Sequence, residues 1–150
     1  MKNSSKVIKS SGYSWANVEK REYKTDTQNF KSIHRYTLLT NDLPGLNTET
    51  RYFEIQPGGY SSLEHHKHTH SVIIIRGSGS VILDNDLKKI AERDVVYISP
   101  ETIHQFHADN SEPLGFICMV DCDRDRPKIP GDDAIRSRIS TEKVLKKIRK

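Results

Sequence analysis

The chain has 150 residues, 34% of them hydrophobic and 29% charged, which is typical of one soluble domain with its own core. The net charge of +4 and pI near 9.0 would suit nucleic acid, but much of the excess lies in the final stretch TEKVLKKIRK. No stretch holds the ~18 apolar residues of a membrane span, and the start MKNSSKVIKS lacks the apolar core of a signal peptide. We therefore predict a cytoplasmic protein that binds neither nucleic acid nor membranes.

The chain divides into three parts. Residues 1–30 are polar and irregular, and the stretch YSWANVEKREYK carries most of their aromatic side chains. We interpret them as an arm that packs over the domain or over a partner subunit, and we expect a homodimer. Residues 31–126 are predicted to form the main β-domain, and residues 127–150 a helical tail.

The middle part consists of short β-rich runs at intervals of about ten residues, including HRYTLLT, TRYFEIQ, SVIIIRG, DVVYIS and LGFICMV. Turn-forming segments separate the runs: PGG at 57–59, GSG at 77–79, DND at 84–86 and DNSEP at 109–113. Many short strands joined by Gly and Pro turns indicate an all-β fold, either an antiparallel sandwich or a barrel.

The tail begins with PKIPGDD, which ends the sheet. Two short helices are predicted after it, the first capped by Asp132 or Asp133 and the second by Ser140 or Thr141. The second helix would present one apolar stripe, formed by Val144, Leu145 and Ile148.

The segment SSLEHHKHTHSV holds four of the seven histidines within six positions. Because alternate residues of a strand face the same side, Glu64 and His66 share one face and His65 takes the other. With a turn at KHT, His70 would join the inward set, and His65 and His68 would face solvent. A carboxylate and imidazoles inside a barrel are costly unless they are neutral, paired or bound to a metal.

The stretch GGYSSLEHHKHTHSVIIIRG resembles the first motif of the cupins, in which a glycine is followed after five residues by His-x-His, then a glutamate and a second glycine. Gly58 and Gly77 stand at the glycine positions, and Glu64, His66 and His70 at the ligand positions. The two outer residue types are exchanged, since Glu64 replaces the first histidine and His70 replaces the glutamate.

The stretch ERDVVYISPETIHQF resembles the second cupin motif and places His104 at its ligand position. It departs from the motif where Arg93 and Glu101 replace glycines and Ala108 replaces an asparagine. The two motifs and the strands between them cover residues 51–121. The resemblance implies a single antiparallel β-barrel of the cupin type, a double-stranded β-helix or jelly roll.

Carried over to this chain, the resemblance implies one divalent metal inside the barrel, bound by Glu64, His66, His70 and His104. Three imidazoles and a carboxylate suit Mn²⁺, Fe²⁺, Co²⁺, Ni²⁺ or Zn²⁺ better than Ca²⁺ or Mg²⁺, and we place manganese first. Glu64 could instead hydrogen-bond to a ligand without touching the metal. His107 is expected to be exposed.

The stretches RYFEIQPGGYSSLE, EPLGFICMVD and RDRPKIP resemble a subgroup of small bacterial cupins that includes the methylthioxylulose-phosphate methylsulfurylases of methylthioadenosine salvage. In that reaction a thiol co-substrate removes the methylthio group of a ketose phosphate. Cys118 shares a strand face with Leu114, Phe116 and Val120, so it could point into the barrel. It is either a small buried core residue or a catalytic thiolate, whereas Cys122 is expected to be inert.

Three functions stay open at this point. The first is a metalloenzyme acting on a small oxygenated metabolite, with methylthio removal as its sharpest form. The second is an iron-dependent dioxygenase with the same ligands, and the third is a sugar- or metabolite-binding protein without catalysis. A phosphorylated substrate would need cationic anchors, for which Arg35, Arg51 and Arg76 are candidates.

Overall fold

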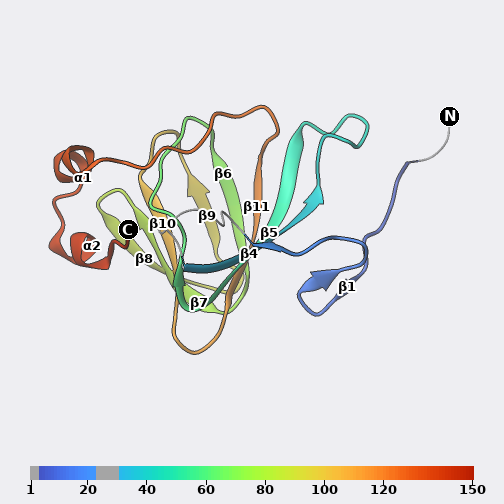
Figure 1. The fold of residues 1–150 in the computed structure, drawn as a ribbon, viewed down its shortest axis with the longest axis horizontal. Coiled ribbons are helices and arrows are strands. Elements are labelled where there is room, and N and C mark those ends of the chain that lie inside the picture. The colour runs from blue at the N-terminus through green and yellow to red at the C-terminus, as the bar shows by residue number, and fades with distance from the viewer. Residues whose placement is uncertain (1–3, 23–30) are drawn as a thin grey trace.

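A computed structural model describes residues 4–22 and 31–150. Of the arm predicted for residues 1–30, residues 1–3 and 23–30 lie outside this described part. The body is a nine-stranded antiparallel sheet that curls into a barrel (Figure 1). This confirms the predicted antiparallel barrel.

The sheet runs in the order β8-β7-β10-β5-β11-β6-β9, with β4 paired to β5 and β3 to β4. A separate hairpin joins β1 (Ser10–Ser11) and β2 (Ser14–Trp15). The strands of the main sheet are β3 (Arg21–Glu22), β4 (Lys31–Leu39), β5 (Thr48–Tyr60), β6 (His70–Arg76), β7 (Ser78–Leu83), β8 (Asp86–Ala91), β9 (Val95–Ile98), β10 (His104–Ala108) and β11 (Leu114–Asp121).

Strand β5 is long enough to belong to both halves of the barrel. It pairs with β11 over Thr48–Ile55 and reaches β10 at Tyr60. The turn predicted for PGG at 57–59 is wrong, because these residues lie inside β5. Gly58 has a φ of +71°, which glycine adopts without strain, and its N–H donates to the Asp109 carbonyl at 3.0 Å. The glycines therefore bend the strand without reversing it.

Strand alternation sends one row of side chains into the barrel. On β11, the face predicted to be shared is buried: Leu114 is 0% exposed, Phe116 5%, Cys118 1% and Val120 3%. Opposite Phe116 on β5 lies Phe53, with ring centroids 5.6 Å apart. Burial of these rows is the main stabilising contribution to the barrel.

Two short helices, α1 (Asp132–Arg138) and α2 (Glu142–Lys147), close a second apolar cluster at one end of the molecule (Figure 1). Ile135 and Val144 are its helical members, and they pack with Ile82 of β7. The position predicted for the second cap is right, because Thr141 precedes α2. The first helix is instead preceded by Gly131, and both predicted cap aspartates lie in its first turn. Their negative charges interact favourably there with the positive end of the helix dipole.

The apolar stripe predicted for α2 is narrower than expected, since Val144 is fully buried whereas Leu145 is 41% exposed. None of the helices in the described ranges is long and apolar enough to cross a membrane.

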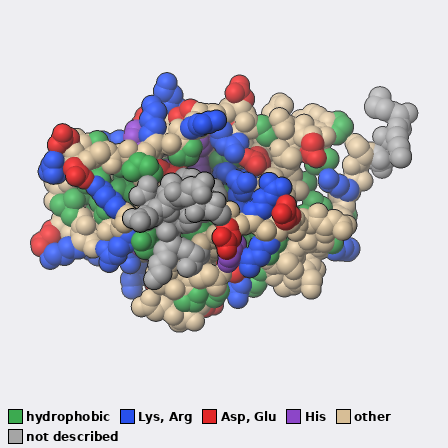
Figure 2. Space-filling model, viewed as in Figure 1, with side chains coloured by type: hydrophobic (Ala, Val, Ile, Leu, Met, Phe, Trp, Pro, Cys, Tyr) green, Lys and Arg blue, Asp and Glu red, His purple; other side chains and the backbone are tan. Residues whose placement is uncertain are grey.

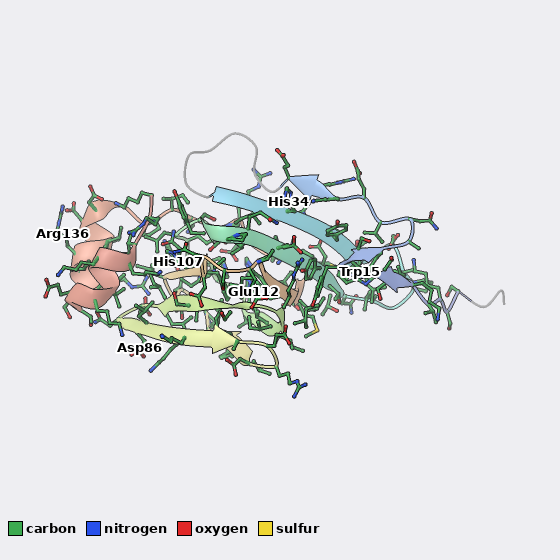
Figure 3. All side chains as sticks on the ribbon, turned by 90° about the horizontal axis from the view of Figure 1, so that it is seen from below. Trp15, His34, Asp86, His107, Glu112 and Arg136 are labelled. Carbon is green, nitrogen blue, oxygen red and sulfur yellow. The ribbon has the colours of Figure 1, made fainter. Side chains whose placement is uncertain are left out.

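Trp15 lies toward the end of the molecule opposite Arg136 (Figure 3). Its ring centroid is 4.9 Å from that of Tyr52 on β5.

Two positions where the cupin motif has glycine keep a glycine-like backbone. Arg93 has a φ of +76° and Glu101 a φ of +61°. A side chain costs about 1–2 kcal/mol in this left-handed region, because its Cβ approaches the following carbonyl. At Arg93 the backbone is held by a hydrogen bond from its N–H to the Ile74 carbonyl at 2.8 Å. The backbone thus has the left-handed conformation of a glycine turn at both positions, although neither residue is a glycine.

We predict that Arg93→Gly raises the free energy of unfolding by about 0.5–1 kcal/mol, because glycine adopts the positive φ without the steric strain of a Cβ. Little packing is lost, since the arginine is exposed. Arg93→Val should lower it, since β-branched side chains tolerate positive φ worst. Urea unfolding of both variants beside the parent chain measures the difference. Equal stability of the two variants would show that the turn carries no strain.

Candidate metal centre and adjoining cavity

A two-residue backbone bridge joins the two histidine-bearing segments. The Glu64 N–H donates to the His104 carbonyl at 3.1 Å, and the His104 N–H donates to the Glu64 carbonyl at 2.9 Å. The first segment then turns back so that His70 opens β6, while His104 opens β10. Side chains 40 positions apart in the sequence therefore meet at one end of the barrel.

His66, His70 and His104 form a group that could hold a metal ion, because one ligand atom of each lies within 4.8 Å of the others. The ring centroids of His66 and His104 are 4.9 Å apart and edge-on, and those of His66 and His70 are 4.5 Å apart and stacked. Three imidazoles from these two segments suit a divalent transition metal.

Hydrogen bonds fix which nitrogen faces the centre in two of these rings. His66 Nδ1 donates to the His68 carbonyl at 2.8 Å, and His104 Nδ1 donates to the Thr102 carbonyl at 2.9 Å. Each neutral ring then presents its Nε2 lone pair for coordination. His66 Nε2 is buried and has no hydrogen-bond partner among the described residues, and a metal ion would satisfy this atom. The residues present therefore fit a metal.

Burial keeps the rings of His66 and His70 neutral. It lowers the pKa of His66 to about 4, with a further contribution from neighbouring His104. It also lowers the pKa of His70 strongly, and His104 and His66 add to that shift. Only neutral imidazole can bind a metal, so the site needs no deprotonation at neutral pH.

Glu64 lies beside the three histidines without joining their group. Its Oε1 is 4.0 Å from His104 Nε2, and its Oε2 accepts a 2.5 Å hydrogen bond from the Ser62 hydroxyl. The carboxylate is buried, with 7% of the residue exposed. Its predicted role as a metal ligand stays a prediction.

The prediction that His68 faces solvent is wrong. Its side chain is only 6% exposed, and its Nδ1 donates to Asp125 at 2.8 Å. Its ring stacks on that of His66 with centroids 3.7 Å apart, and its Nε2 lies 3.2 Å from His70 Nε2. The cause is Asp125, which also accepts the N–H groups of Lys67 and His68 and so holds the KHT turn against the barrel.

His107 was also expected to be exposed, and only 5% of it is exposed. It shares the outer face of β10 with Gln105, whereas Phe106 on the opposite face joins the barrel core. All five residues of β10 are buried because the helical tail covers their outer side, where the Gln105 side chain donates to the Arg149 carbonyl at 2.7 Å. Burial lowers the pKa of His107 to about 3, and Lys147 and Arg149 add to the shift. The side chain of His65 is 19% exposed and pairs with Glu101 at 2.6 Å.

Cys118 faces the same site from β11. Its Sγ lies 3.2 Å from His70 Nδ1 and accepts a hydrogen bond from Arg51 Nη2 at 3.4 Å. His68 lies between His70 and Asp125: its Nε2 is 3.2 Å from His70 Nε2, and its Nδ1 donates to Asp125. Burial raises the pKa of the Cys118 thiol, and the guanidinium of Arg51 opposes that shift.

A cavity of about 170 Å³ adjoins the histidines and Cys118. One part of its wall is polar and contains Glu64, His68, His70 and His104. A second part is apolar and contains Ile33, Phe53, Phe106, Phe116 and Pro127. The third is cationic and contains Arg35, Arg51 and Arg124, beside Cys118. Lys and Arg side chains also gather near the middle of the face shown in Figure 2.

Arg76, the third arginine suggested by the sequence, is absent from this lining. It donates to Glu54 at 2.8 Å and lies over the ring of Tyr13, 4.3 Å from its centroid. Two residues that sequence reasoning missed are Asp125, which holds His68, and Arg124, which donates to Glu49 at 2.5 Å. In the sequence they belong to the charged run CDRDRP, which follows the last predicted strand. Strand alternation therefore cannot predict which of its side chains point toward the site.

Replacing His66 by alanine should lower the metal content of protein purified without chelator by at least about tenfold, because an imidazole donor is lost. His65→Ala is the matched control and should leave the metal content unchanged, since His65 pairs with Glu101 outside the three-histidine group. Elemental analysis by mass spectrometry measures both. Equal losses in the two variants would contradict the assignment of donors.

A second prediction concerns acid stability. The folded pKa of His107, about 3, is below its unfolded value of about 6.5, so the unfolded chain binds more protons at intermediate pH. Stability is then complete above pH 6.5 and is lost as the pH falls toward 3, by at most about 1.4 kcal/mol per pH unit for this group. Urea unfolding of metal-free protein between pH 7 and 4.5 should show a smaller loss in His107→Leu. An unchanged slope would contradict the neutral buried ring.

Comparison with known proteins agrees with this geometry. The family model described as "Cupin domain" matches residues 51–120. The chain is 40% identical over 121 residues to the 1-methylthio-D-xylulose 5-phosphate methylsulfurylase of Rhodospirillum rubrum, covering 80% of this chain and 76% of that protein.

Solved structures give the same result. A cupin 2 conserved barrel domain protein from Rhodopseudomonas palustris superposes with a TM-score of 0.84 at 37% identity, covering 96% of this chain and 98% of that one. A cupin-2 domain protein from Rhodospirillum rubrum gives 0.78 at 37% identity, with 87% of each chain covered. The chain belongs to the cupin family.

Proposed function

We propose that the protein is a metal-dependent enzyme that removes the methylthio group of a ketose phosphate with the help of a thiol. The observation that carries the proposal is the position of Cys118, whose Sγ lies 3.2 Å from a histidine of the metal-binding group and lines the same cavity. The name of the 40% identical relative supports the same reaction.

The proposed reaction has two steps. The Cys118 sulfur attacks the sulfur of the methylthio group, forming a disulfide between Cys118 and the methylthio group and breaking the bond from sulfur to C1 of the ketose. The electron pair of that bond passes to the ketose as an enolate, which takes up the thiol proton at C1 and becomes a methyl ketone. A thiol such as glutathione then attacks the disulfide, carries the methylthio group away and restores Cys118.

The chain's own residues prepare this chemistry. A divalent cation bound by His66, His70 and His104 would act as a Lewis acid on the ketose oxygens. Arg51 donates to the Cys118 sulfur at 3.4 Å and so orients it. The aromatic side chains of Phe106 and Phe116, with centroids 4.7 Å apart, form an apolar wall that fits a methylthio group.

The identity of the metal belongs to the proposal. Manganese is the first choice, and iron, cobalt, nickel and zinc suit the same donors. A cytoplasmic homodimer remains our prediction for the state in which the enzyme works.

Cys118→Ala should lower turnover of a methylthioketose phosphate with glutathione by about a thousandfold or more, because the nucleophile is lost. Metal content and folding should persist, since Cys118 is not one of the three candidate metal ligands. Cys122→Ala is the control and should turn over normally, because Cys122 does not line the cavity. Product formation is followed by mass spectrometry, with oxygen uptake recorded in parallel.

Near-normal turnover of Cys118→Ala with glutathione would return Cys118 to a role in core packing. Oxygen consumption by iron-loaded protein, without any release of the methylthio group, would replace the proposal with a dioxygenase. Binding of the ketose phosphate without either reaction would leave a binding protein.

A further inference from the structure

Arg51 is a buried cation without a buried anion beside it. Only 5% of the residue is exposed, yet no carboxylate of residues 4–22 and 31–150 lies within ion-pair distance of its guanidinium. Its Nε is buried without a hydrogen-bond partner. Its hydrogen bond to Cys118 uses a weak acceptor, and the Phe53 ring 5.0 Å away offsets only part of the charge.

The sheet register holds this side chain over the cavity. Arg51 on β5 stands opposite Cys118 on β11, and Phe53 stands opposite Phe116 one row further on. On the other side of β5, Phe53 pairs with Arg35 of β4, so a second arginine lines the cavity diagonally from Arg51. Both arginines therefore face the space that the histidines border.

The neighbouring arginine shows what is unusual about Arg51. Arg124 lines the same cavity, but Glu49 accepts its hydrogen bond at 2.5 Å and balances its charge. The carboxylate in the cavity lining, Glu64, lies beside His104 and not beside Arg51. Burying an uncompensated charge costs several kcal/mol, so a ligand that brings an anion here would gain strongly.

We propose that Arg51 is the anchor for the phosphate group of the substrate, with Arg35 beside it. The Nε–H and the remaining Nη hydrogens of a guanidinium form a planar fork that matches two oxygens of a phosphate monoester. The inference takes from the proposed function only that the substrate is phosphorylated. Cys118 contacts both this anchor, at 3.4 Å, and His70, at 3.2 Å, so a phosphate held by Arg51 would lie in the same cavity as the thiol and the histidine group.

The test measures binding of inorganic phosphate by isothermal titration calorimetry at constant ionic strength. Arg51→Gln should bind phosphate at least about tenfold more weakly than the parent chain, because the charge and the fork are both lost. Arg76→Gln is the matched control and should change the affinity by no more than about twofold, because that arginine lies outside the cavity in a partly exposed ion pair with Glu54.

Two further arms secure the result. His66→Ala should retain phosphate binding, which separates the arginine anchor from phosphate bound at a metal. In ¹⁵N-labelled parent protein, the Nε–H signal of Arg51, assigned with Arg51→Lys, should shift on addition of phosphate while that of Arg76 stays in place. This measurement stands even if Arg51→Gln fails to fold.

Unchanged phosphate affinity in Arg51→Gln would overturn the inference and leave Arg51 as a partner of Cys118 alone. So would a loss of affinity in His66→Ala without one in Arg51→Gln, or an Arg51 signal that does not move. The proposed function can fail separately, because absence of methylthio removal in a protein that still binds phosphate through Arg51 would leave the anchor intact.

Discussion

The site depends on the pair of backbone hydrogen bonds between Glu64 and His104. They tie the segment that follows β5, at Glu64, to the start of β10. Two further contacts tie the same segments: the Glu101 N–H donates to the His66 carbonyl at 2.7 Å, and the His65 side chain pairs with that of Glu101 at 2.6 Å. Both residues of the bridge are buried, so their backbone N–H and C=O groups cannot exchange these hydrogen bonds for bonds to water. The bridge therefore holds the two segments in a fixed relative position.

The cavity wall contains polar side chains whose burial lowers the stability of the fold. Its wall places a cysteine, a histidine and an arginine in one row, where an interior built for stability would hold aliphatic side chains. The apolar rows on either side, with Phe53 and Phe116 in contact, supply the burial that makes this polar row tolerable. The proposed reaction would account for this polar row, which the fold by itself does not require.

Much of this arrangement could be predicted from sequence. Strand alternation placed Cys118 and its neighbours on β11 correctly, because the period of two is local and strict. The sorting of the histidine cluster failed at His68, whose burial depends on Asp125, 57 positions away. His107 failed for a related reason, since the tail that covers β10 is distant in sequence.

Glycine-based rules were also only partly reliable. The PGG segment has turn chemistry but bends β5 without ending it, because the strand continues to pair with β10 at Tyr60. Conversely, Arg93 and Glu101 hold left-handed backbone without glycine, which no local propensity would suggest. The arginines could be proposed as anchors from their charge, but only the register of β4, β5 and β11 separates Arg51 from Arg76.

The central claim is that Cys118 itself takes the methylthio group from the substrate. Metal-loaded protein should be mixed with a methylthioketose phosphate in the absence of any other thiol, quenched in acid and mapped by peptide mass spectrometry. The account predicts a methylthio group on the peptide that carries Cys118, released again when glutathione is added before the quench. Formation of the deoxyketose phosphate with glutathione, but with no such adduct at any time without it, would contradict the account.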